Sequence, residues 1–248
     1  MKSSSTILVL LLVLLFLQAS GQTGISFTTS TLAGVNVSNP TTLAFGPDNR
    51  LYVTQQDGFI YAYTIQKNGP NNYVVTNTEL ISIIRDIPNH NDRGGLFTGF
   101  VQRQVTGIVA TGTAANPILY ICSSDPRIGG GGELGDIDLD TNSGTISKLT
   151  KNGSTWSMTH LVRGLPRCEE NHSPNGLLLD EVNNILYVAQ GGNTNAGSPS
   201  NNFGFLAEYA LAAAILSIDL DVINNQFGGS YTLPTLDDPT RPNLPDGT

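Results

Sequence analysis

The sequence is poor in charged residues, and this shortage narrows the range of partners that the chain can have. Charged residues make up 13% of the 248, with 12 Lys and Arg against 20 Asp and Glu, which gives a net charge of −8. An acidic chain without a basic cluster argues against nucleic acid and anionic membrane surfaces as partners. Beyond residue 17, no apolar run is long enough to span a membrane as a helix.

An export signal opens the chain. Lys2 precedes an unbroken apolar run over residues 7–17, which is too short to cross a bilayer and fits the central region of a signal peptide. Small residues at 19–21 allow cleavage before Gln22. We therefore expect residues 1–21 to be removed, and the mature chain to be secreted, or periplasmic if the host is a bacterium.

Cysteine is scarce, and secretion decides what the two cysteines can do. Their spacing excludes a Cys-x-x-Cys metal site, and two alternatives remain for Cys122 and Cys168: a disulfide or two buried thiols. Secretion also makes N-glycosylation a prediction at three Asn-x-Ser sequons, which begin at Asn36, Asn152 and Asn171.

Short alternating segments recur along the chain and end at turn residues each time, which is typical of β-strands. The predicted strands are 42–45, 50–54 and 59–65, then 105–110, 118–122 and 144–149, then 175–180, 185–189 and 214–220. In each of the three groups the second strand carries a tyrosine, at Tyr52, Tyr120 and Tyr187, with separations of 68 and 67 residues. The chain is thus predicted to be all-β and built from a repeated unit.

Constant spacing of this kind predicts a β-propeller made of four-stranded antiparallel blades. Residues 22–236 would form about three of a probable six blades, and the Pro-rich run 237–248 would be a loop or a truncated end. The insertions between units, at 89–100, 125–135 and 191–206, should gather on one face and build a binding site. A two-sheet sandwich is the competing fold, although it does not predict evenly spaced repeats.

Histidine occurs three times, and His172 is the candidate for chemistry. His160 lies in an alternating strand and His90 in a polar loop, so both have a structural or solvated interpretation. His172 lies in a loop that leads into a first strand, beside Glu169 and Glu170, where an imidazole can act as a general base. The alternative is a histidine that only hydrogen-bonds the loop backbone.

Three segments resemble the soluble quinoprotein glucose/sorbosone dehydrogenases. Residues 43–53, LAFGPDNRLYV, are similar to the aFgPDGrLYV signature of that family. The GLP at 164–166, with His172 and the glycines at 191–192, is similar to its GLP…H…GD segment, and 214–221, AILSIDLD, resembles a later strand. The resemblance covers most of residues 30–225, the N-terminal half of such a domain.

The resemblance implies a six-bladed propeller that oxidises an aldose and uses pyrroloquinoline quinone (PQQ) with Ca²⁺. His172 would take the proton of the sugar C1 hydroxyl while hydride passes to the quinone. Loop residues would line the cofactor site: Asn171, Asn175, Gly191, Gly192 and Asn193.

Two functions remain open from the sequence. This chain has Gly192 where the family motif has an acid, and Gly176 or Leu177 where it has an arginine. A propeller fold also serves proteins that only bind. The alternative to a sugar dehydrogenase is therefore a non-catalytic extracellular propeller that recognises carbohydrate or protein.

Overall fold

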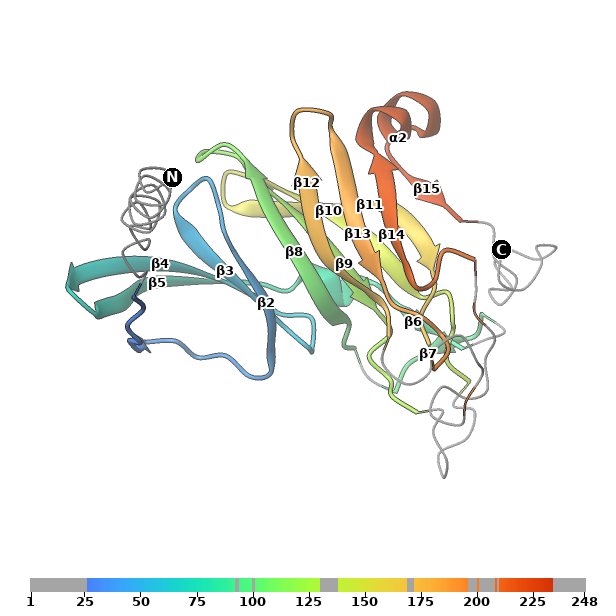
Figure 1. Ribbon diagram of the computed structural model, residues 1–248, viewed down its shortest axis with the longest axis horizontal. Helices are drawn as coiled ribbons and strands as arrows, with labels where there is room; N and C mark the ends of the chain where they lie inside the picture. The colour runs from blue at the N-terminus through green and yellow to red at the C-terminus, as the bar shows by residue number, and fades with distance from the viewer. Residues whose placement is uncertain are drawn as a thin grey trace, which may run out of the picture.

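The computed structural model describes residues 26–91, 94–99, 101–129, 138–168, 172–195, 200, 208 and 210–233. These residues form mostly β-strands, which lie in three larger sheets placed face to face with the second in the middle, and in one two-stranded sheet (Figure 1). The all-β prediction is confirmed. No helix in this part of the chain is both long and apolar enough to cross a membrane. The predicted signal peptide and the Pro-rich end lie outside the described residues.

The first sheet is an antiparallel meander with one added strand. Its strands are β2 (Pro40–Phe45), β3 (Arg50–Gln55), β4 (Ile60–Gly69) and β5 (Asn72–Ile81), and β1 (Leu32–Ala33) pairs parallel with β5. Asn49 and Asn71 take positive φ angles of 58° and 56° at the two tight turns, a conformation that asparagine tolerates. The order along the sheet is β1-β5-β4-β3-β2.

The second sheet repeats that plan. It consists of β8 (Gln104–Gly112), β9 (Pro117–Ser124), β10 (Gly144–Asn152) and β11 (Thr155–Leu165), with β15 (Tyr231–Thr232) parallel to β11 at the edge. The third sheet has the order β12-β13-β14, from β12 (Pro174–Asp180), β13 (Ile185–Gln190) and β14 (Ala214–Asp219). The three repeat tyrosines lie on β3, β9 and β13, the second strand of each meander, as predicted.

Short elements connect the sheets. The 3₁₀-helix η1 (Ile83–Asp86), β6 (Asn89–His90) and β7 (Leu96–Phe97) lie between the first and second sheets. After β14 the chain enters α2 (Leu220–Phe227), whose first turn is capped by the Asp219 carboxylate accepting the Val222 N–H. The helix ends at Gly228, which has a φ of 64°.

Two apolar cores hold the three sheets together. The core between the first and second sheets includes Tyr52, Ile60, Val105, Ile121 and Leu149. The core between the second and third sheets is formed by a similar set: Tyr120, Ile146, Leu165, Leu186, Val188 and Ile218. Burial of these side chains supplies most of the stabilising free energy, as in any packed β-sheet protein.

The outer faces of the first and third sheets are also apolar, but they are exposed. Leu43 and Phe45 on β2 are 62% and 65% exposed, and Leu178 and Ile215 on the third sheet are 66% and 72% exposed. Strands with apolar side chains on both faces are typical of sheets that are covered on both sides. These two faces are therefore suited to pack against further structure.

Of the three insertions predicted to gather on one face, the segments 89–91 and 125–129 are in contact. The backbone carbonyl of His90 accepts hydrogen bonds from Arg127 Nη2 at 2.5 Å and from the Asp140 N–H at 3.3 Å. Arg127 Nη1 also donates to Asn91 Oδ1 at 2.8 Å. The carbonyl of Arg127 accepts from Arg167 Nη2 at 2.8 Å, which joins the loop after β9 to the loop after β11.

Candidate functional site

His172 lies at the end of the loop that joins the second sheet to the third. A reciprocal pair of hydrogen bonds closes this loop: the Cys168 N–H donates to the His172 carbonyl at 2.9 Å, and the His172 N–H donates to Cys168 Sγ at 2.9 Å. Two residues later β12 begins. The neighbouring positions Glu169, Glu170 and Asn171 lie outside the described residues. The predicted base is thus held by backbone contacts and lies at the rim of the third sheet.

The imidazole of His172 is oriented by a carbonyl group. Nδ1 lies 2.9 Å from the carbonyl oxygen of Gly192, which can only accept a hydrogen bond. In the neutral ring this contact places the proton on Nδ1 and a lone pair on Nε2. The side chain is exposed, so substrate in solution can reach it. A histidine held this way can act as a base through Nε2.

A pocket of about 450 Å³ adjoins the ring, and its lining includes Asn175, Gly191 and Gly192. Glycine is required at 191, because a Cβ there would lie 2.9 Å from the Cβ of His172. The structure therefore brings together three of the residues that the resemblance placed near a cofactor. Asn171 cannot be placed, and Asn193 lies next to the pocket in the chain but is fully buried.

Buried amide atoms beside this pocket lack hydrogen-bond partners within the described part of the chain. These atoms are both side-chain polar atoms of Asn193 and Oε1 of Gln190. Glu208 fixes the backbone here, since its carboxylate accepts from the Asn193 N–H at 2.8 Å and from Thr194 Oγ1 at 2.6 Å. Orphaned buried polar atoms are uncommon in folded proteins, and a bound polar group or ion can satisfy them.

The remaining sequence predictions have mixed outcomes. The disulfide expectation is not met, because Cys122 and Cys168 are both buried thiols. Cys122 points into the second core beside Gly107, whereas Cys168 Sγ accepts the His172 N–H in the loop. Sequence spacing could not show that the two side chains have different neighbours. Asn36 and Asn152 are exposed, and their glycosylation stays a prediction.

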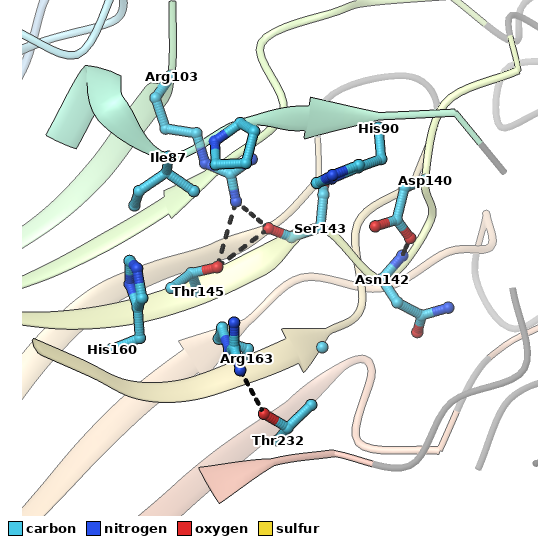
Figure 2. A pocket seen from close by; sticks show the side chains of 12 residues that line it. Ile87, His90, Arg103, Asp140, Asn142, Ser143, Thr145, His160, Arg163 and Thr232 are labelled. Atoms are coloured by element: carbon cyan, nitrogen blue, oxygen red, sulfur yellow. Dashed lines mark hydrogen bonds between the residues drawn. The ribbon is translucent and has the colours of Figure 1, made fainter. Parts of the chain in front are cut away.

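Metal-ligating side chains do not cluster in the described residues: no group of three or more His, Cys, Asp and Glu could hold an ion. His90 and His160 also lie away from His172. Both line a second pocket together with Arg103 and Arg163 (Figure 2). Neither arginine was predicted from the sequence to belong to a site. Arg103 is a single arginine just before an alternating strand, and no sequence pattern marks such a residue as part of a site.

Comparison with known proteins identifies a fold and no family. No family model and no curated protein matches the chain. Two solved structures are similar, both of a carbohydrate-active enzyme of family AA12 from Trichoderma reesei. The calcium structure aligns with a TM-score of 0.50 and 16% identity, over 81% of this chain and 40% of that chain. The iodide structure gives a TM-score of 0.49 and 16% identity, over 82% and 40%.

This chain therefore spans less than half of the length of those neighbours. At such low identity the likeness shows the fold alone.

Proposed function

We propose that this chain is part of a secreted propeller resembling the quinoprotein sugar dehydrogenases, in which His172 is the general base in the oxidation of an aldose. The observation that carries the proposal is the contact of His172 Nδ1 with the Gly192 carbonyl, which directs the basic lone pair to Nε2. That geometry suits removal of a proton from a sugar hydroxyl. The fold neighbour, a carbohydrate-active enzyme, supports a sugar as the substrate class.

The propeller arrangement is supported by the way the sheets are stacked. Each meander packs one face on its neighbour, and the two outermost faces carry exposed apolar side chains such as Phe45 and Ile215. Further blades would cover both faces and close the ring, which removes the exposed apolar surface. A two-sheet sandwich would leave no role for a third stacked sheet.

The polar groups beside His172 fit a bound cofactor. The glycines at 191 and 192 line the pocket, and Gln190 in its wall and Asn193 beside it have amide atoms without partners in the described structure. Asn193 Oδ1 is an oxygen ligand of the kind that Ca²⁺ prefers. The residues that line this pocket include no Lys or Arg, so groups elsewhere must balance the carboxylates of PQQ.

The chain's own part in the reaction is proton transfer and orientation. Nε2 of His172 accepts the proton of the C1 hydroxyl, and the Gly192 carbonyl keeps the ring in the productive tautomer through Nδ1. PQQ, when bound, supplies the hydride acceptor, so that C1 is oxidised as the quinone is reduced. Because Gly192 replaces the acid of the family motif, the group that orients the ring is a backbone carbonyl.

The test is reconstitution of the secreted protein with PQQ and Ca²⁺, followed by dye reduction with a panel of aldoses. We expect sugar-dependent reduction that falls at least about 100-fold in His172→Gln. His90→Gln is the matched control, because it removes a histidine that does not line this pocket, and it should keep full activity. Absence of sugar-dependent reduction, or equal activity of His172→Gln, would overturn the proposal.

A non-catalytic binding propeller is the second candidate, and the missing acid at Gly192 favours it. In that case titration calorimetry with the same sugars should show binding without dye reduction. Sugar affinity would then be unaffected by PQQ, whereas the dehydrogenase proposal expects both binding and turnover.

A further inference from the structure

A second pocket, of about 490 Å³, lies at the outer edge of the second sheet (Figure 2). Its walls come from the segment before β6, the residues that lead into β10, the end of β11 and the edge strand β15. No residue that lines it also lines the pocket beside His172. What could bind here is therefore a separate question from the sugar chemistry proposed for His172.

Arg103 forms one wall of this pocket and is fully buried without an acidic partner in the described structure. Its guanidinium donates to neutral groups: Asn89 Oδ1 at 3.0 Å, Thr145 Oγ1 at 3.2 Å, Ser123 Oγ at 3.5 Å and the Ser143 carbonyl. Taking a cation out of water without a counter-ion is costly. The effect is visible in the pKa of Arg103, which burial lowers to about 10 although Asp125 and Asp140 oppose the shift.

The nearby Arg127, which is partly buried, differs from Arg103 in having a carboxylate in contact with its guanidinium. Arg127 Nη2 forms an ion pair at 2.8 Å with Asp125, and Nε of the same side chain also lies within hydrogen-bond distance of that carboxylate. Arg103 has no such partner among the described residues and faces a pocket instead. The contrast points to a counter-ion that comes from solution.

The other charged groups of the pocket add to the positive potential. Arg163 lies across the pocket from Arg103, where Nη2 donates to Thr232 Oγ1 at 3.1 Å (Figure 2). His160 and His90 complete the titratable lining, with Asp140 as the acid. One carboxylate oxygen of Asp140 already accepts the Asn142 N–H at 2.8 Å. Among the residues that line the pocket, two arginines stand against one carboxylate, and Asp125, which also acts on Arg103, is paired with Arg127.

We infer that this pocket binds an oxyanion, the carboxylate or phosphate group of a small molecule, between Arg103 and Arg163. The exposed guanidinium of Arg163 matches the planar and tetrahedral oxygen geometry of such anions, and Arg103 adds its positive charge. Arg103 is preorganised by its neutral hydrogen bonds, and Arg163 is exposed and able to close on the ligand. The inference does not depend on the function proposed for His172.

His160 provides an internal reporter of occupancy. Burial lowers the pKa of its imidazole, and the charges of Arg163 and Arg103 lower it further, while Nδ1 lies 3.4 Å from Ser147 Oγ. A bound anion opposes the effect of the two arginines and so raises the pKa of His160. By linkage, binding must tighten as the pH falls and His160 gains its proton.

Inorganic phosphate and acetate are the probes, titrated into the purified secreted protein by calorimetry while NMR follows the imidazole signals of His160. We expect saturable binding, a rise in the pKa of His160, and affinity lowered about tenfold or more in Arg163→Met. Arg85→Met is the matched control, because it makes the same change in net charge away from this pocket, and it should bind like the wild type.

Arg163→Met is preferred to a change at Arg103, because an exposed residue can be replaced without loss of folding. Arg163→Lys should restore part of the affinity, since a lysine keeps the charge but not the fork of donors. Two results would overturn the inference. One is the absence of saturable binding by either probe, and the other is equal affinity of Arg163→Met and Arg85→Met.

Discussion

The second sheet contacts its two neighbours in different ways. At the interface with the first sheet, long side chains meet at the rim, where Glu79 accepts hydrogen bonds from Lys151 Nζ at 2.5 Å and from Trp156 Nε1 at 2.9 Å, and pairs with Arg50. At the interface with the third sheet, residues of β8 contact the backbone of β12 directly. Thr106 Oγ1 donates to the Pro174 carbonyl at 2.5 Å, and Gly107 lies against Asn175.

This difference matters for the candidate site. The tight interface fixes the start of β12, and His172 lies two residues before that strand. The side chains around Glu79, between the first and second sheets, can tolerate small rearrangements, because flexible groups such as Lys151 adjust to one another. The contact between the second and third sheets cannot tolerate such rearrangements, since Gly107 has no side chain that could move aside. The position of His172 thus depends on the interface between the second and third sheets, where the two backbones come closest together.

Gly107→Ala should have the largest effect on stability. A Cβ at this position would lie 2.0 Å from the Asn175 carbonyl oxygen, so β8 and β12 would have to separate. We expect a loss of about 2 to 3 kcal/mol in the free energy of unfolding, measured by urea denaturation. Gly176→Ala is the control, because a Cβ at that position would meet nothing within 4 Å, and it should be neutral. Equal midpoints for the two variants would disprove the close approach.

The sequence predicted the strands best where one face of a strand is buried. Alternation at 50–54, 118–122 and 185–189 marked β3, β9 and β13, and the repeated tyrosines gave their equivalence. The segment 72–81 gave no such signal, because only one residue of β5 is buried and its composition does not alternate. The two-residue strands β1 and β15 pair with β5 and β11 through tertiary contacts, so no local sequence pattern predicts them.

The candidate site was predicted in part. His172 and the glycines at 191 and 192 were identified from a motif, and they do lie together around one pocket. Arg103 and the role of Gly107 were missed, because each depends on a partner more than 35 residues away in the chain. Only the folded chain shows that Arg103 is buried without a carboxylate among the described residues. Single residues with distant partners leave no periodicity to detect.

Glu79→Gln should weaken the first interface by a smaller amount. The side chain is 24% exposed, and its loss of charge removes two ion pairs but leaves an amide that can still accept hydrogen bonds. We expect a loss of about 1 to 2 kcal/mol by urea denaturation at neutral pH. Glu181→Gln serves as the control, since Glu181 is exposed and accepts a hydrogen bond from Thr111. A Glu79→Gln protein as stable as this control would show that the rim cluster contributes nothing.

The same cluster makes a prediction about pH. Burial alone would raise the pKa of Glu79, but hydrogen bonds from Lys151, Arg50 and Trp156 outweigh it and lower the pKa below the ordinary 4.5. A lowered folded-state pKa contributes stability that is fully present above the unfolded value and is lost as pH falls through the folded value. The stability gap between wild type and Glu79→Gln should therefore stay constant down to about pH 4.5 and then narrow. Unfolding curves from pH 7 to pH 3 measure it, and a gap that widens in acid would contradict the ion-pair account.

Thr111→Val should have the smallest effect on stability. It tests a surface hydrogen bond between the second and third sheets separately from the backbone contact at Gly107. Thr111 Oγ1 donates to Glu181 Oε1 at 2.5 Å, but the pair is exposed, so water can replace the lost hydrogen bond. Valine keeps the shape and favours a strand, and we expect a change below about 0.5 kcal/mol in urea denaturation. Because Gly107 and Thr111 lie on the same strand, the two variants compare a backbone approach with a surface hydrogen bond. If Thr111→Val were as damaging as Gly107→Ala, the interface would depend on its rim, and the backbone contact would not be what places β12 and His172.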